Sequence, residues 1–344
     1  MIRISIIYTG GTIGMVNDPV SKVLMPFDFE RITSQVPELN RFGYELVPDS
    51  FTPLMDSSDM QPEDWIRIAE SIEKNYNDFD GFVVLHGTDT MAYTASALSF
   101  LLENLQKPVI LTGSQLPIGE IRTDAKENFI TSIQFAASKA EGRSSLSEVC
   151  VYFDYQLFRG NRTSKVSASG FGAFHSANLP PLARTGVHVS FSNDLILPSP
   201  SKEQPFKVYK NLNARIGLLK LFPGITASYL HQFFSMNDLE AVVLESYGSG
   251  NAPSSPWFIK ELEEAIKNGL IIYNVTQCAE GTVEQGRYAT SKHLKEIGVI
   301  GGYDITTEAA VTKLMFLLGQ GLSKADVLLK LQQSLKGELT IPSI

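Results

Sequence analysis

The stretch IRISIIYTGGTIG, from Ile2 to Gly14, is an apolar run that ends in a glycine pair flanked by threonines. A nearly continuous apolar run of this length is typical of a parallel strand that is covered on both faces. Three similar runs follow in the chain, namely GFVVLHG (81–87), KPVILTG (107–113) and EVCVYFD (148–154). Segments with one apolar face separate them, as in QPEDWIRIAESIEKNY (61–76), where Pro62 suits the first helical position. The sequence therefore predicts a doubly wound α/β domain with a mostly parallel sheet.

The alternation is interrupted once, between residues 190 and 213, where FSNDLILPSPSKEQPFK is rich in Ser and Pro. Such a composition indicates a linker or crossing loop. Four further strand-like runs follow, namely RIGLLKLF (215–222), LEAVVLES (239–246), LIIYNVT (270–276) and GVIGGYD (298–304). We therefore expect an N-terminal α/β domain over residues 1–189, a linker over 190–213 and a smaller C-terminal α/β domain over 214–344.

Composition excludes several classes of partner. Lys plus Arg is 29 and Asp plus Glu is 37, so the formal charge is −8, and no basic run could follow a phosphate backbone. We expect no nucleic acid partner. The only cysteines are Cys150 and Cys278, which argues against a disulfide framework. The first residues do not resemble a signal peptide, and no apolar stretch reaches the roughly 20 residues of a membrane helix. We expect a cytoplasmic protein without a membrane partner.

Familiar catalytic motifs are missing from the sequence. The glycines near Gly10 fit neither the phosphate loop nor the dinucleotide fingerprint, and G-x-S-x-G does not occur. The histidines are scattered without the spacing of metal ligands: His86, His175, His188, His231 and His293. A metal site and an esterase with a histidine base are therefore disfavoured.

Polar residues follow several of the predicted strands. They are Thr12 after the first strand, Asp56, Ser57 and Ser58 after the apolar FTPL, Thr88 and Asp89 after the second clear strand, and Lys165 past the fourth. Open α/β sheets bind their ligands at the carboxyl ends of strands, so we expect these loops to meet at one edge.

This set of side chains suits nucleophilic attack on a small polar carbonyl compound. A threonine hydroxyl is a weak nucleophile that needs a base and donors for the oxyanion. A lysine made neutral by burial can withdraw a proton through a second threonine. Asp89 could orient these groups or hold a substrate ammonium, while Ser57 and Ser58 could hold a carboxylate.

Each residue taken alone also has a purely structural interpretation. A threonine after two glycines is commonly a helix N-cap, Asp89 could cap the following helix, and Asp56 with its two serines could form an Asx or Ser turn. A lone lysine such as Lys165 is usually a solvated charge. Four such loops together are harder to explain as caps.

The motifs T-G-G-T-I (9–13) and H-G-T-D-T-M (86–91) resemble those of the bacterial-type L-asparaginases, in particular the cytosolic type I branch. The resemblance extends through DSSDM, TGSQLP, RGNRTSK, SYGSGNAP, TQCAEGTV and GVIGGYD, so it covers essentially the whole chain. It implies hydrolysis of L-asparagine to L-aspartate and ammonia without a metal or an organic cofactor.

The resemblance also implies a role for each site residue. Thr12 would be the nucleophile that forms an acyl-enzyme ester, with Thr88, Asp89 and Lys165 handling the proton. The amino-acid clamp would consist of Asp56, Ser57, Ser58 and Asp89. Asn251 would be lent across an intimate homodimer, and such dimers often pair into homotetramers.

The sequence departs from the family pattern at two places. The family's tyrosine after T-G-G-T-I is missing from residues 15–27, where Leu24 stands in its place, and Glu245 replaces a basic residue that some members use at a second, activating asparagine site. A non-catalytic amino-acid-binding sensor is the alternative function. A pure binder would not require both threonines and Lys165, which favours the enzyme.

Overall fold

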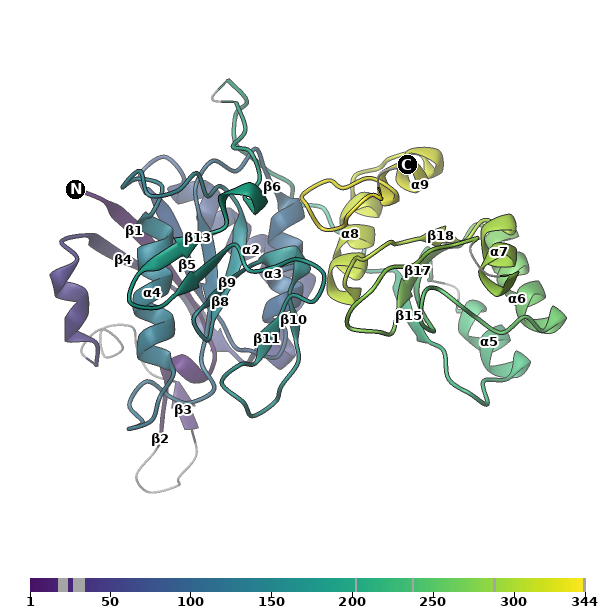
Figure 1. Cartoon of the computed structure of the whole chain (residues 1–344), viewed down its shortest axis with the longest axis horizontal. Helices are drawn as coiled ribbons and strands as arrows, with labels where there is room; N and C mark the ends of the chain where they lie inside the picture. Colours follow the sequence, from purple (N-terminus) through teal and green to yellow (C-terminus); the bar gives the residue numbers. More distant parts are fainter. Residues whose placement is uncertain (18–23, 27–34, 202, 237, 287–288, 343–344) are drawn as a thin grey trace. The chain divides into compact units, whose positions relative to one another are not determined.

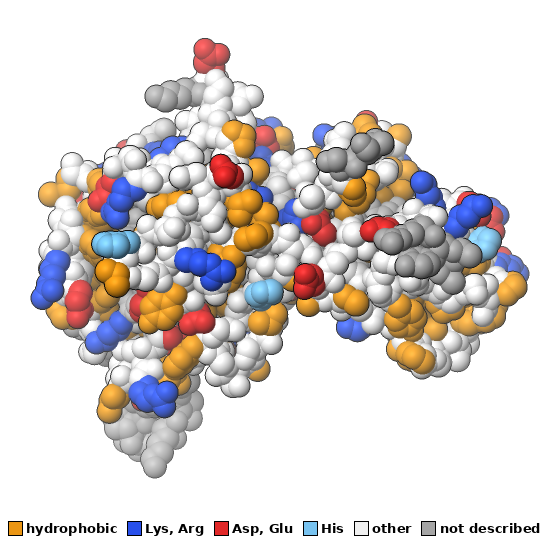
Figure 2. Space-filling view, in the orientation of Figure 1, with side chains coloured by type: hydrophobic (Ala, Val, Ile, Leu, Met, Phe, Trp, Pro, Cys, Tyr) orange, Lys and Arg blue, Asp and Glu red, His pale blue; other side chains and the backbone are white. Residues whose placement is uncertain are grey.

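The computed structural model describes residues 1–17, 24–26, 35–201, 203–236, 238–286 and 289–342. The chain divides into two compact units, Met1–Lys210 and Asn211–Ile344 (Figure 1). On the face shown in Figure 2, acidic and basic side chains are interspersed over both units. No helix in the described ranges combines the length and the apolar character that crossing a bilayer requires.

The first unit is built on an eight-stranded sheet. From one edge to the other its strands are β13 (Val189–Phe191), β12 (Ala183–Thr185), β9 (Gln156–Arg159), β8 (Val149–Phe153), β7 (Val109–Thr112), β5 (Gly81–Leu85), β1 (Arg3–Gly10) and β4 (Glu45–Met55). The last five of these pair in parallel, and the others are antiparallel. The four predicted parallel strands, β1, β5, β7 and β8, are confirmed.

Strand β4 is not predicted by the sequence. Its residues ELVPDSFTPLM are mostly polar or proline, and most of its side chains are at least partly exposed. Pro48 and Pro53 have no N–H to donate to a ladder, so a strand that contains them is confined to a sheet edge. β4 lies at that edge and pairs only with β1 among the strands of this sheet.

Within the described residues of this unit, the helices that cover the sheet are α2 (Pro62–Asn75), α3 (Met91–Leu101) and α4 (Ala125–Ala137). α2 begins as predicted, with Pro62 in its first turn and a capping box in which Asp64 accepts the backbone N–H of Gln61 at 3.0 Å. α4 contributes Phe129 and Ile133 to one core cluster with β-strand residues such as Ile6. α2 and α3 pack against each other.

The segment 190–213 differs from the predicted linker, because most of it belongs to the first unit. β13 extends the large sheet, and β14 (Lys207–Val208) pairs with β6 (Leu102–Glu103). Phe206 stacks on Tyr76 of the first unit with ring centroids 3.6 Å apart. These strands are two or three residues long, which is too short for a hydrophobic period to be recognised. The units meet in the sequence between Lys210 and Asn211.

The second unit contains a four-stranded parallel sheet, in the order β15 (Ile216–Lys220), β16 (Ala241–Ser246), β17 (Ile271–Thr276) and β18 (Ile300–Gly301). Its helices are α5 (Ala227–Phe234), α6 (Pro256–Lys267), α7 (Ala289–Glu296), α8 (Thr307–Gly319) and α9 (Lys324–Leu331). Lys313 of α8 forms a fully buried ion pair with Glu338 at 2.7 Å. The predicted class, a mostly parallel α/β unit followed by a smaller α/β unit, is confirmed.

Candidate active site

Glycines without side chains allow three loops of the first unit to meet at the carboxyl ends of β1, β4 and β5. Gly11 has φ 91°, and a Cβ atom there would lie 2.5 Å from the backbone nitrogen of Gly87. A Cβ atom on Gly87 would lie 2.4 Å from Ser57 Oγ. Both positions are closed to larger residues, because real Cβ atoms do not approach other atoms this closely. The loops after β1 and β5 therefore touch through their backbones, and the Ser57 side chain of the loop after β4 packs against Gly87, so the three loops meet at one edge as the topology predicts.

Thr12 lies in a short 3-10 turn, η1 (Thr12–Gly14), that directly follows β1. Gly11 occupies the N-cap position of this turn, so Thr12 itself is not the cap. The Gly14 N–H donates to the Gly11 carbonyl at 3.2 Å, and the buried Tyr8 hydroxyl donates to the Gly14 carbonyl at 3.0 Å. Thr12 is half-buried, which leaves its side chain accessible to a small ligand.

The loop after β5 begins with the fully buried His86. His86 Nδ1 lies 2.6 Å from the Gly87 carbonyl, and its Nε2 lies 2.8 Å from Thr94 Oγ1 of α3. A carbonyl only accepts, so Nδ1 carries the proton and Thr94 donates to Nε2. Burial lowers the pKa of His86 to about 4, so the ring is neutral at physiological pH. His86 is thus a structural residue that holds this loop.

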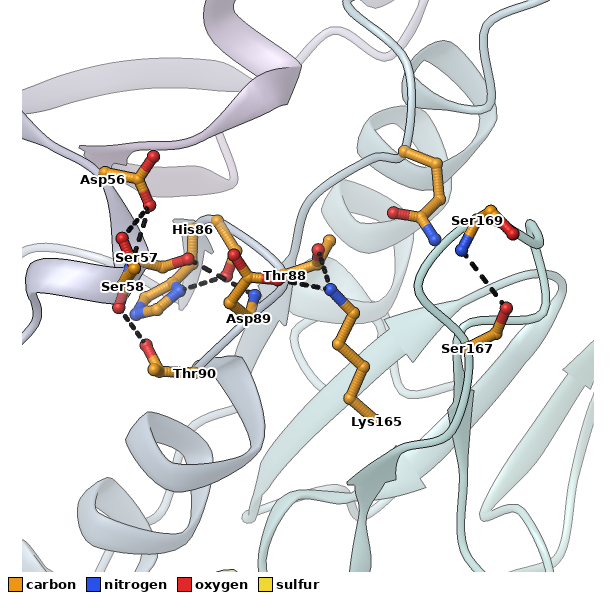
Figure 3. Close-up of polar contacts among 12 residues, drawn as sticks. Asp56, Ser57, Ser58, His86, Thr88, Asp89, Thr90, Lys165, Ser167 and Ser169 are labelled. Carbon is orange, nitrogen blue, oxygen red and sulfur yellow. Dashed lines mark hydrogen bonds and ion pairs between the residues drawn. The ribbon is translucent and has the colours of Figure 1, made fainter.

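Lys165 joins the two polar residues that follow Gly87. Its Nζ donates to Thr88 Oγ1 at 2.8 Å and to Asp89 Oδ1 at 2.6 Å (Figure 3). Lys165 ends β10 (Ser164–Lys165), which pairs with β11 (Phe174–His175). Its side chain is 18% exposed, whereas that of Asp89 is 62% exposed. Lys165 is therefore not a free solvated charge, and the Asp89 carboxylate remains open to a ligand.

The loop after β4 is bonded to the loop after β5. Ser57 is buried, its Oγ accepts the backbone N–H of Asp89 at 3.3 Å, and its carbonyl accepts the hydroxyl of Thr90 at 2.7 Å. Asp56 Oδ1 accepts both the N–H and the hydroxyl of Ser58, each at 2.9 Å. The Asx-turn interpretation is thus correct for Asp56. Asp89 is not a helix cap, because Thr90 holds the N-cap position of α3.

The loop after β7 reaches the same region. Gln115 Nε2 donates to the Gly170 carbonyl at 2.9 Å, in the segment that connects β10 to β11. Asp124 fixes the loop by accepting the backbone N–H groups of Gln115 and Leu116. This contact supports the segment that follows Lys165, and the T-G-S-Q-L-P motif gave no hint of that partner.

Asn251 lies in the second unit, in a tight turn after β16. Its backbone N–H and carbonyl both bond to Tyr247, at 2.8 and 2.9 Å. Its predicted partnership with the other site residues stays a prediction. The side chain of Leu24 lies outside the described residues, although its backbone belongs to β3 (Leu24–Pro26), which pairs with β2 (Met15–Asn17).

Among the residues that the structure describes, no group of three or more His, Cys, Asp or Glu side chains could hold a metal ion. Sequence reasoning missed the roles of Tyr8 and Thr94. In the sequence, Tyr8 belongs to an apolar strand pattern and Thr94 to a helical segment, so neither has a local signal that would indicate its hydrogen-bond partner.

Comparisons with known proteins match both units. Residues 3–197 match the family described as Asparaginase, N-terminal, and residues 215–328 match the Glutaminase/Asparaginase C-terminal domain. The chain is 46% identical to L-asparaginase 1 of Escherichia coli (strain K12) over 341 residues, 98% of each chain. The solved structures that are similar to this chain include two L-asparaginases. L-asparaginase I from Vibrio cholerae has 41% identity and a TM-score of 0.88, with 98% of this chain and 99% of that chain covered. The thermostable L-asparaginase from Thermococcus kodakarensis has 29% identity and a TM-score of 0.90, with 99% and 100% covered. With its polar loops arranged around Gly11 and Gly87 and both units matched, the chain belongs to the asparaginase family.

Proposed function

We propose that this chain is an L-asparaginase that hydrolyses L-asparagine to L-aspartate and ammonia through an ester on Thr12. The observation that carries the proposal is the bridge from Lys165 Nζ to both Thr88 and Asp89. These two residues follow Gly87, whose backbone lies against Gly11 at the start of the Thr12 turn. A binding module needs a charge for its ligand but has no use for a lysine that contacts a threonine hydroxyl. The L-asparaginases among the relatives support the substrate.

In the proposed reaction, the Thr12 hydroxyl attacks the side-chain amide carbon of asparagine. Its proton passes through Thr88 to Lys165, which must first lose a proton to act as a base. The tetrahedral intermediate then expels ammonia, the leaving nitrogen taking up the proton that Lys165 received, and leaves an aspartyl ester on Thr12. Water hydrolyses this ester and releases aspartate.

We propose that the substrate is held by the clamp predicted from the sequence. The exposed Asp89 carboxylate is available to the α-ammonium group. Ser57 Oγ accepts a hydrogen bond from Asp89 N–H, and its own proton has no acceptor among the residues that the structure describes, so it is available to the α-carboxylate. Asp56 orients Ser58 beside it.

We also propose a cytoplasmic homodimer or homotetramer in which Asn251 completes the site of a partner copy. The resemblance to the family supports the assembly. Cys150 is a buried free thiol and Cys278 an exposed one, and an exposed free thiol suits a reducing compartment.

The decisive experiment compares Thr12→Ala with Thr12→Ser. We expect Thr12→Ala to release no ammonia while calorimetry still detects asparagine binding, since the clamp lies on other loops. Thr12→Ser keeps a hydroxyl and should retain part of the rate. Substantial ammonia release by Thr12→Ala would contradict the nucleophile. If the unaltered chain binds asparagine without releasing ammonia, it is a sensor.

A further inference from the structure

We propose that Tyr8 is a positioning residue that holds the Thr12 turn in the geometry for attack, by donating its phenol proton to the Gly14 carbonyl. The inference rests on the proposed function, because it matters only if Thr12 is the nucleophile. It assigns to a buried strand residue a role in the rate of the reaction.

The hydrogen bond from the Tyr8 hydroxyl ties strand β1 to the end of the turn at Gly14. Tyr8 lies on β1, is 1% exposed, and its hydroxyl reaches the Gly14 carbonyl at 3.0 Å. Gly14 is the last residue of η1 and Thr12 the first. Strand β1 leads into the start of the turn at Thr12, and the phenol of Tyr8 fixes its other end at Gly14. Burial raises the pKa of Tyr8, so the phenol remains a donor at every working pH.

The turn depends on such outside support. It is three residues long, and its closing bond runs from Gly14 N–H to Gly11 O at 3.2 Å. One turn of 3-10 helix has little stability of its own. It also follows Gly10 and Gly11, whose φ angles of 134° and 91° favour glycine, so neither residue has a side chain that could hold the turn. A second bond, from Ile118 N–H to the Ile13 carbonyl, is long at 3.4 Å.

The residue at position 14 is matched to the phenol. A Cβ atom on Gly14 would lie 1.8 Å from Tyr8 Oη, so any other residue would displace the hydroxyl from the carbonyl. Tyr8 and Gly14 therefore form a unit in which the absence of one side chain admits the other. A misplacement of about 1 Å at the nucleophile can reduce the rate on the order of 100-fold. Loosening this unit should act on the chemical step.

The experiment compares Tyr8→Phe with Tyr273→Phe. Tyr273 is also fully buried, and its hydroxyl donates to the Leu331 carbonyl at 3.0 Å, but it lies in the second unit. Each variant removes one buried phenol bond to a backbone carbonyl, so both should lower the melting temperature by a similar amount. At a temperature where both are folded, we expect Tyr8→Phe to lower kcat about 10- to 100-fold with KM within about threefold. Tyr273→Phe should keep kcat within about twofold.

Two further variants, Gly14→Ala and Thr12→Ala, test the positioning role separately from the proposed function. Gly14→Ala retains the phenol but displaces it, and should lower kcat in the same way, with slower ammonia release in a single turnover. Positioning by Tyr8 is wrong if Tyr8→Phe and Gly14→Ala keep the kcat of Tyr273→Phe, or if Tyr273→Phe loses as much as they do. Thr12→Ala is measured in parallel. If it retains activity, the proposed function fails; if it is inactive while Tyr8→Phe is fully active, only the positioning role fails.

Discussion

His86 should make the first unit lose stability in mildly acidic solution. Its pKa is lowered to about 4 by burial, against an ordinary value of 6.5 in the unfolded chain. Between these values the unfolded state binds a proton that the folded state does not, so the free energy of unfolding falls as the pH falls from 6.5 towards 4. With 1.36 kcal/mol per pKa unit, the His86 contribution between pH 7 and pH 5 is a loss of about 2 kcal/mol.

The assay follows urea unfolding of the first unit at pH 7 and pH 5. The chain has two tryptophans, Trp65 in the first unit and Trp257 in the second, so a Trp257→Phe background leaves Trp65 as the fluorescence reporter. In this background, His86→Gln should lose about 2 kcal/mol less between the two pH values than the parent does.

The control variant replaces an exposed histidine, His175→Gln. It should leave the difference between the two pH values as large as in the parent. The comparison uses each variant's own change with pH, so a uniform loss of stability in His86→Gln does not affect the result. Equal changes with pH in the parent and in His86→Gln would refute a buried neutral histidine at this position.

Three further outcomes are expected. Lys165→Met should lower kcat by a factor of roughly 10²–10⁴ with asparagine binding nearly intact, whereas Asp89→Ala should weaken binding and turnover together. Calorimetry with asparagine in a Thr12→Ala background separates the two variants, and equal losses of binding would place Lys165 in the clamp. Glutamine should be a poorer substrate than asparagine, because one methylene shifts its amide away from Thr12; similar kcat/KM values in an ammonia-release assay would contradict the proposed geometry. In urea denaturation, Lys313→Met should lower the free energy of unfolding by about 3–5 kcal/mol, since it leaves the buried Glu338 carboxylate without its ion-pair partner. The control Lys267→Met, which breaks a surface pair with Glu263, should lower it by less than about 1 kcal/mol.

Elements with a local sequence signal could be predicted before the fold was known. β1, β5, β7 and β8 are apolar runs because both faces of each strand are covered, and α2 shows its proline start and its apolar face within 14 residues. The polar residues at the ends of these strands could be predicted to meet, because parallel strands present their carboxyl ends to one edge.

Tertiary structure alone decided the pairings that have no local signal. β4 is a strand only because β1 offers it an edge, and β14 exists through its pairing with β6. The contact of Lys165 with Thr88 joins residues 77 positions apart. The bond from Tyr8 to Gly14 forms because a glycine leaves room for a phenol. Hydrophobic periodicity in the sequence indicates which side of a helix or strand is buried. Which segment packs against that side depends on the shapes of the side chains and on hydrogen bonds that form only in the folded chain.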